Sequence, residues 1–135
     1  MFLLKNKFVA FCKDNNYKYN ENIYTFESSA ISQFDVVTKT FFKRIHHFLF
    51  IKSDNFNYIE LLAKTLSEDK KFIKDVVILL CETTLNLNHE HCLYIGENGS
   101  QFVHCVYHNI DSNKYTYYTE TIGTPKLLKD FIKNI

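Results

Sequence analysis

The segment HEHCLYIGENGSQFVHCVYH, residues 89–108, carries the strongest local folding signal in the chain. Its periodicity is that of β-strands on both sides of Asn98-Gly99, a dipeptide typical of a two-residue turn in which both central residues have positive φ. The pattern predicts a β-hairpin with strands over 91–96 and 101–109. The turn NIDSN then leads to a third strand over 114–121, so the region predicts an antiparallel meander.

A two-residue turn also determines which residues face each other across the hairpin. It places Cys92 opposite Cys105, Leu93 opposite His104, Ile95 opposite Phe102 and His89 opposite His108. A three-residue turn with a bulge would scramble these pairs. Because side chains alternate between the two faces of a sheet, four histidines would share one face: His89, His91, His104 and His108.

Those four histidines suggest a zinc site as an alternative hypothesis. Neutral imidazoles on neighbouring strands can ligate zinc, and His89, His91 and His108 form the best-placed trio, with His104 as a fourth ligand. The spacing matches no zinc finger and no HExxH motif. The favoured interpretation therefore has no cofactor, with His89 and His91 in a polar connection and His104 among apolar neighbours.

The cysteines and histidines of this segment do not predict catalysis. Cys92 and Cys105 could form a redox-sensitive disulfide, but they are better explained as small apolar residues of the core. His104 and Cys105 are adjacent in one strand, so their side chains point to opposite faces and cannot pair for nucleophilic catalysis. The chain also has no glycine-rich phosphate loop and no carboxylate pair in an apolar setting. We therefore expect a protein that is not an enzyme.

Outward from the hairpin, the remaining sequence predicts mostly helices. The spacing of apolar residues and the capping signals predict the following elements: a helix over 2–13, a strand over 22–28, a helix from Ser28 or Ser29 through Phe48, a helix from Asp54 or Asn55 through Leu66, a helix from Ser67 to about Leu87, and a last helix with Thr124 as cap and Pro125 as its first residue.

These elements predict one α+β domain over residues 1–135. The N-terminal helices would pack on a C-terminal antiparallel meander of three to four strands, and the terminal helix would dock on the same core. The chain has no internal repeat and no linker-like composition that would divide it.

The composition excludes several classes of partner. A net charge of +1 gives no general attraction to nucleic acid or to an anionic membrane. The longest apolar run, residues 76–81, is too short to span a bilayer, and lysines interrupt the apolar N-terminus, so we expect no signal peptide and a cytoplasmic protein.

A compact domain without a catalytic constellation is by default a binding protein. We therefore expect a small protein that occludes or chaperones one cognate protein, most concretely an immunity protein or antitoxin that neutralises a toxin, with a secretion chaperone as a close variant. The predicted last strand of the meander is an edge rich in tyrosine, and edge strands and aromatic patches both recruit partners. The expected contact residues are Tyr115, Tyr117, Tyr118 and Glu97. The sequence does not predict the oligomeric state.

Overall fold

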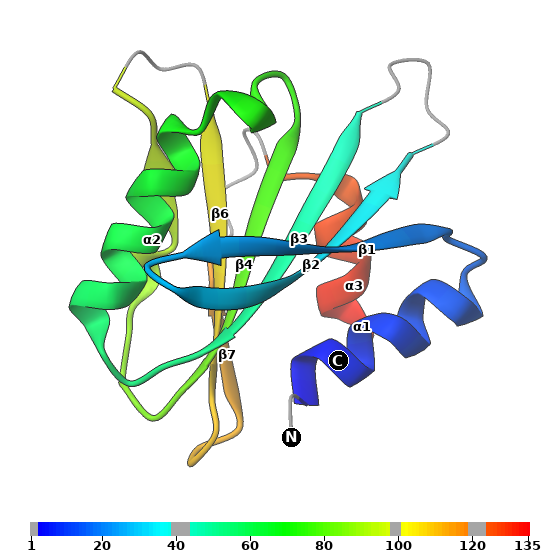
Figure 1. The fold of residues 1–135 in the computed structure, drawn as a ribbon. Coiled ribbons are helices and arrows are strands. Elements are labelled where there is room, and N and C mark those ends of the chain that lie inside the picture. Colours follow the sequence, from blue (N-terminus) through cyan, green and yellow to red (C-terminus); the bar gives the residue numbers. More distant parts are fainter. Residues whose placement is uncertain (1–2, 39–43, 98–100, 119–123) are drawn as a thin grey trace.

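The computed structural model describes residues 3–38, 44–97, 101–118 and 124–135. It shows a β-sheet with helices on both faces, which confirms the α+β class (Figure 1). Within the described residues the elements in chain order are α1 (Leu3–Asp14), β1 (Tyr19–Phe26), β2 (Ser29–Val37), β3 (Ile45–Lys52), α2 (Phe56–Glu68), the 3₁₀ turn η1 (Lys70–Phe72), β4 (Val76–Thr83), the 3₁₀ turn η2 (His89–His91), β5 (Leu93–Ile95), β6 (Phe102–Asn109), β7 (Lys114–Tyr117) and α3 (Lys126–Lys133).

The strands form one mixed sheet in the order β1-β2-β3-β4-β6. β1, β2 and β3 are antiparallel neighbours, whereas β3, β4 and β6 run parallel. β4 occupies one edge of β6, and β5 and β7 both pair antiparallel with its other edge, beside its first and second halves. The predicted meander of three to four strands is therefore wrong in strand number and in strand direction, although β5, β6 and β7 do pair antiparallel.

The segment after β1 forms two strands, not the helix predicted to begin at Ser28 or Ser29. Ile31 and Phe34 stand at helical spacing, but in β2 they lie on opposite faces of the sheet, each in a different core. β3 is buried on both faces, so its apolar residues show no alternation. Short buried strands and helices give the same sequence signal. Residues 39–43 of that predicted helix lie outside the described residues.

The helix predicted from Ser67 to about Leu87 is also wrong. That segment contains η1 and then β4, which is buried from Val77 to Thr83 and paired on both edges with parallel strands. Parallel strands covered on both faces read as continuous apolar runs, and VVILL is such a run.

Several local predictions are confirmed. α1 and α2 lie where the apolar spacing placed them, and the Asn55 side chain caps α2 by accepting the Tyr58 N–H at 3.2 Å. β1 is a strand, although it begins and ends earlier than the predicted 22–28. α3 is present, but its N-cap is Pro125 and not Thr124, so the helix begins at Lys126.

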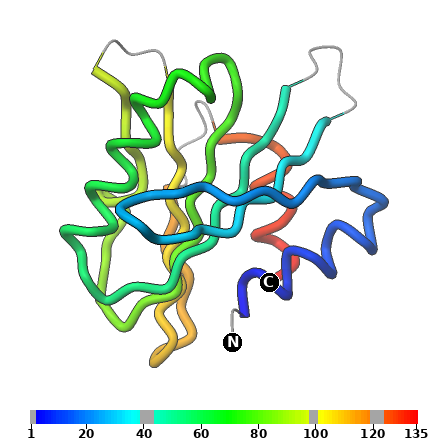
Figure 2. The backbone as a smooth tube through the Cα atoms, viewed as in Figure 1, coloured from blue at the N-terminus to red at the C-terminus, as the bar shows by residue number. Residues whose placement is uncertain are grey.

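Each face of the sheet has its own apolar core. α2 covers one face, and the tip of the β1–β2 hairpin lies beside it (Figure 2). The hairpin contacts the helix through Phe26 and Tyr58, whose ring centroids are 5.5 Å apart. α1 and α3 cover the other face, where Phe8 lies at the centre of an aromatic cluster. The start of α1 is held by the sheet, because the Leu4 N–H donates to the buried Glu82 carboxylate at 2.8 Å.

Among the described residues no helix has the length and hydropathy needed to cross a membrane.

A two-residue turn, Glu27-Ser28, joins β1 to β2. Phe26 pairs with Ser29, and Glu27 and Ser28 have φ values of 46° and 65°. Both angles lie in the left-handed region that type I′ turns require and that side chains other than Asn and Gly adopt at a cost.

Replacing this turn with its preferred residues is expected to stabilise the protein. The double variant Glu27→Asn, Ser28→Gly should raise the free energy of unfolding by about 1 kcal/mol, because both residues are exposed and only the backbone strain changes. Urea unfolding followed by circular dichroism measures the shift in midpoint. Ser29→Gly is the matched control, since it puts a glycine into the adjoining strand and should destabilise. An unchanged or lower midpoint for the double variant would contradict the turn geometry.

Candidate functional site

The predicted contact tyrosines lie along the rim of the two cores. β7 pairs with β6, and Tyr115 stacks on His108 with ring centroids 4.4 Å apart. Its hydroxyl accepts a hydrogen bond from Lys7 Nζ at 2.9 Å. Tyr115 and Tyr117 pack against the core under α1 and α3, whereas Tyr118 packs against the core under α2. All three rings are half-buried, so only part of each is accessible to a partner. Residues 119–121 of the predicted strand lie outside the described residues.

The most open apolar surface in this region lies at the β5–β6 hairpin. Ile95 and Phe102 are directly paired, and they are 56% and 47% exposed. Their side chains share the face of the sheet that α1 and α3 cover farther along β6. Glu97 is exposed two residues beyond Ile95. Glu97, a predicted contact residue, therefore lies two residues from an exposed apolar pair that the sequence analysis did not name as contacts.

Gly96 and Gln101, at the loop end of this hairpin, are fixed to the end of α2. The Gly96 N–H donates to the Gln101 carbonyl at 2.9 Å, and the Gln101 side chain donates to the Leu66 carbonyl. A Cβ at Gly96 would lie 2.5 Å from the Ser67 carbonyl oxygen, so only glycine fits there. The residues next to Ile95 and Phe102 are therefore held against α2 by hydrogen bonds and close packing.

The four histidines of the zinc hypothesis do not converge. His89 and His91 lie in η2 and not in the strand predicted from residue 91, and the His91 ring packs against Phe56 at 4.9 Å. His104 and His108 are buried on β6, and His108 Nε2 lies 2.8 Å from Asn113 Oδ1. The predicted pairing of His89 with His108 is absent, because β5 begins only at Leu93.

Among the described residues no three His, Cys, Asp or Glu side chains are arranged to hold a metal ion. His104 is uncharged at neutral pH. Burial lowers its pKa to about 4, and the nearby His46 contributes to this shift. Both observations fit a packed, neutral histidine.

Cys92 and Cys105 face each other as the hairpin register predicts, and the Cys105 N–H donates to the Cys92 carbonyl at 2.7 Å. Both are buried free thiols. Burial raises the pKa of Cys92 to about 12, so the thiol is protonated at neutral pH and unreactive. They pack in the core under α2.

A buried ionic cluster that the sequence analysis missed lies on the α2 face of the sheet. His47 on β3 stands between two carboxylates, with Nδ1 2.7 Å from Asp35 Oδ1 and Nε2 2.8 Å from Asp75 Oδ2. The Phe72 ring packs against the imidazole at a tilt, with ring centroids 4.5 Å apart. Asp35 accepts further hydrogen bonds from Gln33 and Asn22.

The surroundings of this cluster favour the charged forms. Burial alone would lower the pKa of His47, but the hydrogen bonds to Asp35 and Asp75 raise it above its ordinary value. Burial alone would raise the pKa of Asp35, but the hydrogen bonds from His47 and Gln33 lower it. When His47 is protonated, both imidazole nitrogens donate hydrogen bonds to carboxylates. In that form both nitrogens are engaged, and neither is free to accept a proton.

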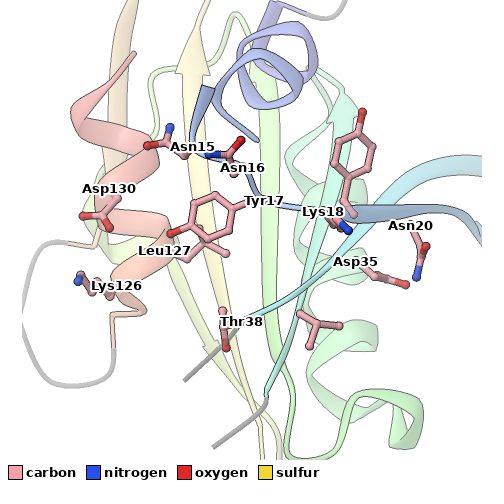
Figure 3. A pocket seen from close by; sticks show the side chains of 12 residues that line it. Asn15, Asn16, Tyr17, Lys18, Asn20, Asp35, Thr38, Lys126, Leu127 and Asp130 are labelled. Carbon is pink, nitrogen blue, oxygen red and sulfur yellow. The ribbon is translucent and has the colours of Figure 1, made fainter. Parts of the chain in front are cut away.

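A cleft of about 760 Å³ opens beside the cluster, between the α1–β1 turn, the end of β2 and the start of α3 (Figure 3). Tyr17 and Leu127 provide apolar lining, and Lys18 and Asp130 provide charges of both signs. Asp35 lines the cleft as well, so the ionic cluster forms part of its wall. No local sequence pattern predicts this cleft, because its walls come from three remote segments.

Comparison of the chain with models of protein families, with curated proteins and with solved structures finds no match.

Proposed function

We propose that this protein is a non-catalytic binding protein that occludes one cognate protein, as an immunity protein or antitoxin does with its toxin. The observation that supports it is the exposed pair Ile95–Phe102 beside Glu97 on the β5–β6 hairpin. Large apolar side chains that lie together on a surface and are flanked by charge are typical of protein contact sites.

The geometry of the pair supports a specific contact. Directly paired side chains on adjacent strands form one continuous apolar surface, and an aromatic residue at its centre is the usual energetic anchor of an interface. The backbone hydrogen bond between Gly96 and Gln101 and the close packing on Ser67 hold this surface in place before binding. A preformed surface loses little conformational entropy when the partner docks.

The tyrosines of β7 extend the proposed contact along the same edge of β6. β5 and β7 pair with that edge one after the other, so the accessible parts of Tyr115 and Tyr117 continue from Ile95 on one face. Tyr118, which follows β7, packs on the opposite face and borders the contact from there. Their half-buried rings fit the border of a contact better than its centre. The proposal needs no bound metal and no reaction chemistry.

The test is binding to the cognate protein. A tagged chain is used to isolate the partner from the native cell, and the dissociation constant is then measured with purified proteins. Truncating the apolar pair in the double variant Ile95→Ala, Phe102→Ala should weaken binding about 30-fold or more, because anchors of this kind contribute about 2 kcal/mol or more.

Ile110→Ala is the matched control, because Ile110 is 42% exposed but lies beyond the far end of β6. It should bind as the wild type does. If the partner is a toxin, co-expression of the wild-type chain should restore growth and the double variant should not. Wild-type affinity in a folded double variant would refute the proposed surface.

A further inference from the structure

The outer edge of β1 is the longest unpaired strand edge among the described residues. β1 pairs with β2 only, and five of its eight residues are exposed. Ile23, at 71%, is the most exposed large apolar side chain in the described part of the chain. The strand has one charged residue, Glu21, and neither proline nor glycine. Edge strands that stay unpaired are usually short or are protected by charge, proline or bulges.

The β1–β2 turn shows which backbone groups point outward. In a two-residue hairpin the residues that flank the turn, here Phe26 and Ser29, form a hydrogen-bonded pair. Hydrogen-bonded and non-hydrogen-bonded pairs then alternate along the strands. The N–H and C=O groups of Thr25, Ile23 and Glu21 therefore point away from β2, and each of these residues has an exposed side chain.

A second copy of β1 fits this edge in antiparallel orientation. With the two-fold axis at Ile23, each Ile23 lies opposite its own copy, and Glu21 lies opposite Thr25 of the second chain. No like charges face each other in this register. The exposed isoleucines then cover each other, and the outward amides find partners.

The charges at the two ends of β1 specify the same orientation. Lys18 precedes the strand and Glu27 follows it, and both are exposed. Antiparallel self-pairing brings Lys18 of one copy near Glu27 of the other, twice per dimer. Parallel pairing would instead bring lysine to lysine and glutamate to glutamate.

We propose that β1 is a self-association edge through which two copies of this chain form a two-fold dimer with one continuous sheet. This edge is separate from the Ile95–Phe102 surface, so the dimer leaves the proposed partner contact open. A contact made through one strand pair is small, and we expect a dimer that forms and dissociates with concentration.

The test is sedimentation of the purified chain without any partner, from roughly 10 to 500 µM. The wild type should shift from monomer to dimer over this range. Ile23→Lys should remain monomeric, because it places two lysines opposite each other at the axis. Ile110→Lys, which alters an exposed isoleucine elsewhere, should dimerise like the wild type. A monomer at every concentration, or a dimer that survives Ile23→Lys, would overturn the proposal.

Two further experiments test the register. Lys18→Glu and Glu27→Lys should each weaken dimerisation several-fold at low salt, and the two changes combined should restore it.

Ile23→Cys should form an intermolecular disulfide on mild oxidation, because the two copies of residue 23 lie directly opposite each other. Asn22→Cys should cross-link far less, because Asn22 faces Tyr24 of the second copy. Equal cross-linking of both variants would exclude this register. Failure of partner binding would leave all of these results unaffected.

Discussion

Truncation of Phe8 to alanine is expected to lower the free energy of unfolding by about 4 kcal/mol. Phe8, in α1, is fully buried. Its ring centroid lies 4.3 Å from that of Phe48, 5.5 Å from that of Phe50 and 5.4 Å from that of Phe131. It therefore joins α1 to two regions that are remote in sequence, β3 and α3. Removing the ring loses its burial and leaves a cavity that the rigid strands cannot close.

Urea unfolding followed by circular dichroism measures this loss. Phe8→Leu, which keeps most of the volume, should cost about 1.5 kcal/mol and remains measurable if the alanine variant fails to fold. Phe102→Ala is the matched control for phenylalanine truncation, because Phe102 is 47% exposed and should cost less than about 1 kcal/mol. Equal losses for Phe8→Ala and Phe102→Ala would contradict the packing described for α1.

Replacement of His47 with alanine should lower the free energy of unfolding by about 3 kcal/mol near pH 5.5. The change leaves Asp35 and Asp75 without the cation that both contact, at 2.7 and 2.8 Å. It also removes the ring that packs on Phe72.

The effect of this replacement depends on pH, and the direction follows from the two pKa shifts. The pKa of His47 is raised in the folded state, so its stabilisation is complete below the unfolded pKa of about 6.5 and is lost as the pH rises through the folded value. The pKa of Asp35 is lowered, so its stabilisation is present above the unfolded pKa of about 3.9 and is lost as the pH falls through the folded value. The cluster therefore contributes most between about pH 4 and 6.5.

Urea unfolding of wild type and His47→Ala at pH 5.5 and pH 9 tests this dependence. The difference between the two proteins should shrink at pH 9, where only the lost packing and neutral hydrogen bonds remain. Comparing the proteins at the same pH cancels the titration of His104, whose pKa of about 4 destabilises the fold in acid. Adding Asp35→Asn to His47→Ala should recover part of the loss by removing one of the two carboxylates. A difference that is constant with pH would show that no ionic cluster forms.

Two of the clearest sequence signals were correct because they depend on neighbours in the chain. Asn55 caps α2 through its own third following residue, Tyr58. The β5–β6 register places Ile95 opposite Phe102 and Leu93 opposite His104, as predicted from alternation around Asn98-Gly99. Residues 98–100 themselves lie outside the described residues.

Local sequence patterns predict the pairing of residues in the proposed contact surface but not their exposure. The register already paired Ile95 with Phe102, but their exposure depends on how far α1 and α3 extend over that face of the sheet. Glu97 was named from its place in a turn, and its apolar neighbours became visible only with the fold. The tyrosines of the predicted last strand were named as contacts, but their burial depends on Lys7, His108 and the cores that they border.

The sequence by itself determined the elements whose signals are local: α1, α2, α3, β6 and the pairing of β5 with β6. Periodicity and capping act over a few residues, so they can be read without knowing the fold. Only the tertiary structure decided that residues 29–37, 45–52 and 76–83 are strands, because a short apolar run becomes a strand when distant strands complete its hydrogen bonds. The same distant pairing brings Asp35, His47 and Asp75 together and leaves the outer edge of β1 open. These features depend on which segments become neighbours in space, and local sequence patterns do not contain that information.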